Sequence, residues 1–140
     1  MHPDHVAAVQ RSFAQVAPIA PQAAALFYRH LFAADPSLRP LFKGDMAVQG
    51  ERLMAMIATG VSLLGRPAAL LPALRGLGAR HASYGVLPEH YATVGAALLK
   101  TLEQGLGDAW TPATAQAWAA AYGVISDAML EGAESFAEAT

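Results

Sequence analysis

Five histidines are the candidate nitrogen ligands in this sequence of 140 residues, which contains no cysteine. The lack of cysteine excludes disulfides, thiolate zinc sites, iron–sulfur clusters and thiol catalysis. The nucleophile elbow of hydrolases and the glycine-rich loops that bind phosphate are absent too. Spacing alone leaves Ser-His-Asp catalysis open. The chemistry that the sequence could support therefore depends on where the histidines lie.

Four of the histidines occupy positions typical of the protein surface. His2 and His5 lie near the N-terminus among polar neighbours, and His30 follows Arg29 directly. His90 lies in the first turn of a predicted helix, after a proline and a glutamate. We therefore expect these four side chains to face solvent.

His81, in the stretch RHASYGV, continues an apolar helical face that includes Leu74, Leu77 and Gly78. A histidine near a helix C-terminus is favoured by the helix dipole when it is charged. The Gly-Val that follows is typical of a helix end, with glycine in the left-handed conformation and an apolar residue next. From the local sequence alone, His81 fits a core or helix-end residue, and a role as a ligand stays open.

The composition limits the partners of the chain. The formal net charge is −2, and no cluster of Lys and Arg is longer than a pair, so neither nucleic acid nor anionic lipid is expected as the main partner. No apolar run approaches the ~18 residues that a membrane span requires, and the N-terminus lacks the pattern of a signal peptide. Hydrophobic residues reach 54 % and charged residues 14 %. Much apolar surface must therefore be packed against something, which could be an apolar ligand. We expect a cytoplasmic protein.

Prolines separate the chain into helical segments, because a proline does no harm in the first turn of a helix. Asp35-Pro36 and Thr111-Pro112 are typical of an N-cap followed by the first turn. The predicted helices cover residues 3–16, 20–34, 36–42, 46–64, 67–82, 88–106 and 112–137. The stretch 42–48 is the expected irregular loop. The sequence therefore predicts one all-α domain over residues 1–140, with six to eight helices.

Several segments together resemble one family. RHASYGV, LPEHYATVG and AWAAAYGVISDAML closely resemble the second half of bacterial single-domain haemoglobins and of the globin domain of flavohaemoglobins. LFYRHLFAADPSLRPLF is similar to their second helix, their short third helix and the phenylalanine that follows. Each motif is weak alone, but their order and spacing agree from about Phe13 to Met129. The resemblance implies a globin fold around a pocket for haem b.

The resemblance also assigns roles to individual residues. It implies that His81 is the proximal ligand of the haem iron, which leaves the opposite position for a gas. Tyr28 and Gln49 correspond to the distal pair of this family. The remaining pocket positions that the resemblance assigns are Leu53 on the distal wall, and Phe42, Arg52, Leu77, Val86, Tyr91 and Val94 around the cofactor. Taken alone, Phe42 fits a core aromatic nearly as well, and Arg52 a solvent-facing side chain equally well.

The distal residue types suit oxygen. A tyrosine hydroxyl and a glutamine amide both donate hydrogen bonds, and bound oxygen accepts them. Two such donors would slow oxygen release greatly, because about 1.4 kcal/mol corresponds to a factor of ten. Neither group ligates ferrous iron well, so the resemblance implies a mostly five-coordinate ferrous state.

The sequence departs from the family beside the proximal histidine. In flavohaemoglobins this histidine belongs to a hydrogen-bonded network with a tyrosine, matched here by Tyr91, and a glutamate of the last helix. Ala133 stands at the glutamate position, between Glu131 and Glu134. A carboxylate one residue away points ~100° around the helix and could substitute only if the helix shifts. The departure favours oxygen binding over redox catalysis.

Three functions follow from the resemblance. The first is reversible oxygen binding for storage, delivery or sensing. The second is nitric oxide dioxygenase activity, in which oxygen and nitric oxide give nitrate and a separate reductase supplies electrons. The third, a haem-free regulatory module, is disfavoured because the histidine, both distal residues and Phe42 are all present.

Overall fold

The computed structural model describes residues 1–139, which contain α-helices, 3-10 helices and no strand. The α-helices are α1 (Pro3–Val16), α2 (Ala20–Ala34), α3 (Met46–Ser62), α4 (Pro67–Ser83), α5 (His90–Leu106) and α6 (Pro112–Ala139). The 3-10 helices are η1 (Ala17–Ile19), η2 (Pro36–Leu41) and η3 (Gly107–Ala109). The all-α prediction is confirmed. No helix in this described range is long and apolar enough to cross a membrane.

Both predicted capping residues cap the start of a helix. The Asp35 side chain accepts a hydrogen bond from the Ser37 amide at 3.1 Å. The Thr111 hydroxyl accepts one from the Thr114 amide at 3.2 Å. Each bond satisfies an amide that has no partner within the helix.

Two predicted helices differ from the structure in helix type or in their first residue, and three others end one or two residues away from the predicted position. The segment predicted as 36–42 is a 3-10 helix that ends at Leu41, and Pro40 inside it has no N–H to donate to an α-helical ladder. The helix predicted from residue 88 begins at His90 instead. There the His90 Nδ1 accepts a hydrogen bond from the Leu87 amide at 3.0 Å, so the preceding residues form a turn and Pro88 lies outside the helix.

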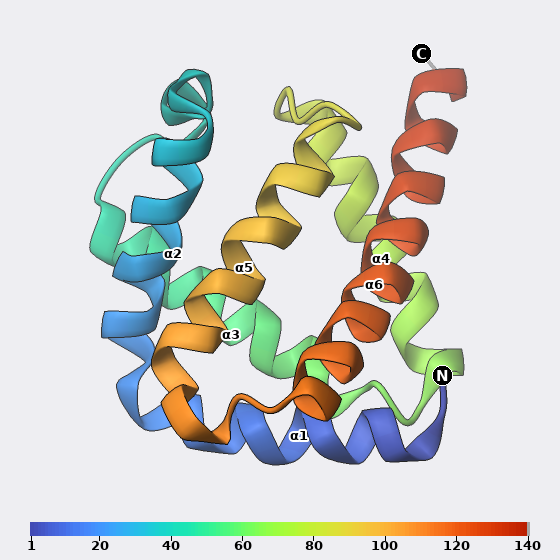
Figure 1. Ribbon diagram of the computed structural model, residues 1–140. Coiled ribbons are helices and arrows are strands. Elements are labelled where there is room, and N and C mark those ends of the chain that lie inside the picture. The colour runs from blue at the N-terminus through green and yellow to red at the C-terminus, as the bar shows by residue number, and fades with distance from the viewer. Residues whose placement is uncertain (140) are drawn as a thin grey trace.

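The main core lies where α1 runs across the base of the molecule beneath α5 and α6 (Figure 1). Trp118 of α6 and Val9 and Val16 of α1 are almost fully buried there. The Trp118 indole N–H donates to the buried Ser12 hydroxyl at 2.8 Å. This bond satisfies a polar group that would otherwise be costly to bury.

The second core lies between α2, η2, α3 and α5. Its buried members are Phe27, Tyr28, Leu31, Leu38 and Ala97, and half-buried apolar side chains pack around them. Gly50 of α3 faces α2 here, where a Cβ would lie 2.9 Å from the Ala24 Cβ. The small residue thus lets α3 approach α2 closely.

Two glycines bring α4 and α6 into backbone contact. A Cβ on Gly78 of α4 would overlap the backbone of Met129, and one on Gly132 of α6 would overlap the backbone of Arg75. These two helices form the most extensive helix–helix packing in the molecule. The position of α4, which carries His81, is therefore fixed by α6.

Candidate functional site

His81 lies half-buried in the last turn of α4. Its Nδ1 is 2.9 Å from the Leu77 carbonyl oxygen, which can only accept a hydrogen bond. We therefore assign the Nδ1 proton to this bond, which leaves the neutral ring with an unprotonated Nε2. Burial lowers the pKa of His81, the Leu77 bond raises it and the Arg80 charge lowers it. A neutral imidazole with a free Nε2 is the form that ligates a metal ion.

The helix end beside His81 has the geometry predicted from the sequence. The Val86 amide donates to the His81 carbonyl at 3.1 Å, and the Gly85 amide donates to the Ala82 carbonyl at 3.1 Å. Gly85 has a φ of 96°, in the left-handed region where glycine is favoured. These two bonds form a Schellman motif. It turns the chain sharply and brings Val86 into contact with the main core.

Tyr28 lies among three phenylalanine rings. Its ring centroid is 5.3 Å from those of Phe27 and Phe42, with edge-to-face geometry, and 5.9 Å from that of Phe32, which is stacked. The Tyr28 side chain is 8 % exposed, and burial raises its pKa to about 12. Within residues 1–139 its hydroxyl has no hydrogen-bond partner. Tyr28 is thus a neutral donor held in place by aromatic packing.

The structure divides the other predicted apolar site residues between the two cores. Phe42, Leu53 and Val94 pack with Tyr28 in the second core. Leu77, Val86 and Tyr91 belong to the main core. Leu98 of α5 contacts both cores, which meet along this helix.

The polar predicted residues of α3 are placed differently. The Gln49 amide nitrogen donates to the Lys43 carbonyl at 2.6 Å. Arg52 is exposed.

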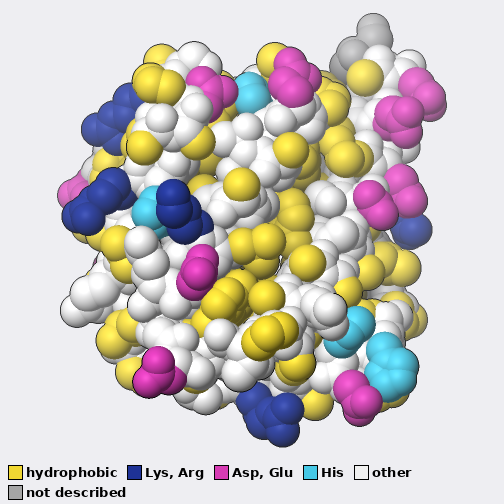
Figure 2. Space-filling view, in the orientation of Figure 1, with side chains coloured by type: hydrophobic (Ala, Val, Ile, Leu, Met, Phe, Trp, Pro, Cys, Tyr) yellow, Lys and Arg dark blue, Asp and Glu magenta, His cyan; other side chains and the backbone are white. Residues whose placement is uncertain are grey.

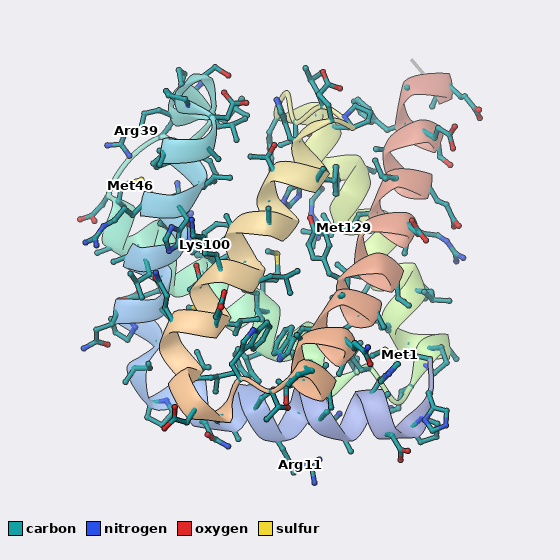
Figure 3. The ribbon with its side chains drawn as sticks, viewed as in Figure 1. Met1, Arg11, Arg39, Met46, Lys100 and Met129 are labelled. Atoms are coloured by element: carbon teal, nitrogen blue, oxygen red, sulfur yellow. The ribbon has the colours of Figure 1, made fainter. Side chains whose placement is uncertain are left out.

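Figure 3 shows Arg39 and Met46 on the same side of the molecule, next to α2. The Arg39 guanidinium lies 5.1 Å from the Phe32 ring centroid, and Met46 packs against the second core. The chain segment before α3 therefore covers the Tyr28 cluster from this side.

Neither glutamate replaces a carboxylate at Ala133. The Glu131 carboxylate pairs with the Arg75 guanidinium at 3.0 Å, and Glu134 is exposed. Figure 2 shows acidic side chains along the C-terminal half of α6. Among residues 1–139, the causes of the pKa shift of His81 are burial, the Leu77 carbonyl and the Arg80 charge, and none of them is a carboxylate. The hydrogen bond of the His81 Nδ1 therefore goes to a neutral carbonyl.

Tyr91 completes this side of the site. Its hydroxyl is buried without a hydrogen-bond partner among the described residues, and burial raises its pKa. The Tyr122 hydroxyl donates to the Tyr91 backbone carbonyl at 2.5 Å. The Tyr122 ring occupies the space above Gly95, where a Cβ would lie 2.9 Å from its Cδ2. A carboxylate at position 133 would offer an acceptor for such a buried, unpaired hydroxyl.

The other histidines have roles outside this site. The exposed His2 accepts from the Asp4 amide at 3.0 Å and so caps α1. The His30 Nε2 is 2.8 Å from the Gln104 side-chain oxygen at the surface. Across residues 1–139, no group of three or more His, Cys, Asp or Glu side chains could hold a metal ion. A metal bound at His81 would therefore take further ligands from outside these side chains.

Sequence reasoning missed several residues that shape the site. The three-ring surround of Tyr28 includes Phe27 and Phe32, and the four-residue spacing of Tyr28 and Phe32 was the available signal. The Lys43 carbonyl and the α4–α6 glycine contacts depend on the tertiary structure. The sequence contained no local signal for them.

The chemistry of these residues suits an apolar cofactor that carries a metal. Phe42, Leu53, Leu77, Val86 and Val94 are all half buried, although their side chains are large and apolar. Full burial of such side chains is the usual outcome in a packed interior. Together they offer apolar walls from α3, α4, α5 and two loops. His81 offers a metal-ligating nitrogen on one side and Tyr28 a hydrogen-bond donor within the second core.

The chain matches known proteins over most of its length. Residues 25–129 match the family model described as Globin. Flavohemoproteins of Pseudomonas putida and Rhizobium meliloti are 39 % and 37 % identical to it, over 77 % and 78 % of the chain. The chain spans 28 % of the length of each of these relatives.

Solved structures share the fold. A bacterial globin from Campylobacter jejuni gives a TM-score of 0.85 at 22 % identity, and the match covers 98 % of this chain and 99 % of that one. The flavohemoglobin of Malassezia yamatoensis, with bound FAD and heme, gives 0.79 at 24 % identity over 96 % of this chain and 37 % of that one. The expected globin fold is confirmed.

Proposed function

This chain belongs to the globin family, and we propose that it binds haem b through His81 and reversibly binds oxygen. Haem supplies a ferrous iron with a coordination position open to a diatomic gas. The proposal depends on one observation above all, the hydrogen bond from the His81 Nδ1 to the Leu77 carbonyl. That bond fixes the tautomer and orients the ring, as second-shell partners do for metal-ligating histidines.

The residues around Tyr28 support oxygen as the ligand. Because the pKa of Tyr28 is raised to about 12, its hydroxyl remains a donor throughout the physiological range. This hydroxyl would donate a hydrogen bond to oxygen held at the haem. Phe42 and Leu53 provide apolar surface in the same core, and an apolar surround strengthens a hydrogen bond. We propose that the role is oxygen storage, delivery or sensing in the cytoplasm.

A haem titration of the purified protein followed by its visible spectrum tests this proposal. The wild type should give a Soret band, and the ferrous form should be five-coordinate. His81→Ala should abolish stable binding, because the iron loses its protein ligand. His30→Ala is the matched control, since this histidine lies at the surface, and it should bind haem as the wild type does. Failure of the wild type to give a Soret band would refute the proposal, as would unchanged binding by His81→Ala.

A second candidate function is nitric oxide dioxygenase activity supported by an external reductase. The names of the flavohemoprotein relatives favour it, because electrons for turnover would come from a flavin. The acceptor for the His81 Nδ1 argues against it, because a neutral carbonyl makes the imidazole less electron-donating than a carboxylate would. Nitrate formation from nitric oxide, measured over many turnovers with a flavin reductase present, distinguishes the two. Stoichiometric nitrate followed by arrest in the ferric state would support oxygen binding alone.

A further inference from the structure

Gln49 bonds to the loop that precedes its own helix. It is the fourth residue of α3, and its amide nitrogen donates to the Lys43 carbonyl at 2.6 Å. Two further bonds close the same segment. The Asp45 side chain accepts from the Ala47 amide at 2.7 Å, and the Asp45 carbonyl accepts from the Gln49 amide at 3.0 Å.

Gly44 gives the loop the conformation that this bond requires. Its φ is 87°, and a Cβ would meet nothing within 4 Å. Backbone conformation, and not space, is therefore what favours glycine at this position. Lys43 follows Phe42 directly, and the Phe42 ring centroid is 5.3 Å from that of Tyr28. The loop thus joins the Gln49 side chain to the Tyr28 cluster.

The two expected distal donors, Tyr28 and Gln49, differ in the hydrogen bond that each would break in order to donate to a bound gas. The Lys43 carbonyl holds one of the two hydrogens of the Gln49 amide at an exposed position, so while this bond is kept the amide nitrogen stays beside the loop. The Tyr28 hydroxyl has no partner among the described residues and so gives up no hydrogen bond within the protein. A donor that must first break a bond within the protein gains little net stabilisation, whereas the Tyr28 hydroxyl can bond a gas without breaking one.

We propose that the Lys43 carbonyl holds the Gln49 amide, so that Gln49 closes the loop over residues 42–45 and Tyr28 alone donates to the bound gas. Gln49 is then a positioning residue, which acts on the loop that carries Phe42. The part of this inference that concerns the gas rests on the proposed function. The part that concerns the loop does not.

Oxygen dissociation from the haem-loaded protein tests the first part. Tyr28→Phe keeps the aromatic packing and removes the donor, so oxygen should leave about tenfold faster or more. Gln49→Leu should change the rate less than twofold. Gly44→Ala, which strains the loop and releases the Gln49 amide, should slow oxygen release. The double variant Gly44→Ala/Gln49→Leu should return to the wild-type rate. An increase in Gln49→Leu as large as that in Tyr28→Phe would overturn the proposal.

Amide hydrogen exchange of residues 43–47 tests the second part in both the haem-loaded and haem-free protein. Gln49→Leu should speed exchange there about tenfold, because the loop loses one hydrogen bond. Tyr28→Phe should leave exchange of these amides unchanged. Unchanged exchange in Gln49→Leu would overturn the role in loop closure. If the wild type bound no haem, the proposed function would fail, whereas exchange in the haem-free chain would still decide whether Gln49 closes the loop.

Discussion

Gly132→Ala tests whether the close contact between α4 and α6 sets the position of the helix that carries His81. A Cβ at residue 132 would overlap the Arg75 backbone, which cannot rotate away as a side chain could. The helices must therefore separate. Gly123→Ala is the matched control, because it makes the same change in the same helix where a Cβ would meet nothing within 4 Å.

The two substitutions should have opposite signs. In a helix interior, alanine is more favourable than glycine by about 0.8–1.0 kcal/mol, so Gly123→Ala should stabilise by about that amount. Gly132→Ala gains the same helix propensity, but overpacking costs about 1–3 kcal/mol and occasionally more. We therefore expect the free energies of unfolding of the two variants to differ by about 1–3 kcal/mol, with Gly132→Ala the less stable.

Urea unfolding of the haem-free variants measures this difference without the contribution of a ligand. The rate of haem loss from the loaded protein then reports on the site, and Gly132→Ala should lose haem faster because α4 moves. Equal stability of the two variants would refute the reasoning. A stability loss in Gly132→Ala with an unchanged rate of haem loss would show that the contact supports the fold without positioning His81.

Three further predictions concern buried hydroxyls and the proximal side. The oxygen dissociation rate should be constant from pH 6 to 10, because the pKa of Tyr28 is raised to about 12 and its hydroxyl stays protonated; a change centred near pH 10 would contradict this. Ser12→Ala should lower the free energy of unfolding by about 1–3 kcal/mol, measured by urea titration, because the Trp118 indole loses its buried acceptor. Ala133→Glu should lower the iron reduction potential in spectroelectrochemistry, and Tyr91→Phe in that background should cancel the change, because the unpaired Tyr91 hydroxyl would mediate it.

The same Tyr28 shift has a consequence for stability at high pH. Burial favours the neutral phenol in the folded protein, whereas the unfolded chain ionises near its ordinary pKa of 10. The folded state therefore holds more protons between pH 10 and about 12, and stability falls as the pH rises through that window. Tyr28→Phe should remove this part of the alkaline destabilisation.

Local sequence determined most of the helices and the end of the helix that carries His81. Asp35 and Thr111 cap helices as their residue types predict, since a cap bond joins residues only two or three positions apart. Gly85 ends α4 for the same reason, because its left-handed conformation and both bonds of the motif lie within six residues. The exception at Pro88 has a local cause as well, a bond from His90 that the pattern of prolines did not reveal.

Only the tertiary structure decided what the long side chains of the site contact. The family resemblance paired Gln49 with Tyr28 as a distal donor, whereas in the fold the Gln49 amide donates a hydrogen bond to the Lys43 carbonyl. It left Glu131 as a candidate partner for the proximal side, and the fold pairs that carboxylate with Arg75. A flexible polar side chain can reach several acceptors, and the choice depends on groups brought close by other helices. Sequence spacing therefore determined which donors exist, whereas helix packing decided which of them remain free for a ligand.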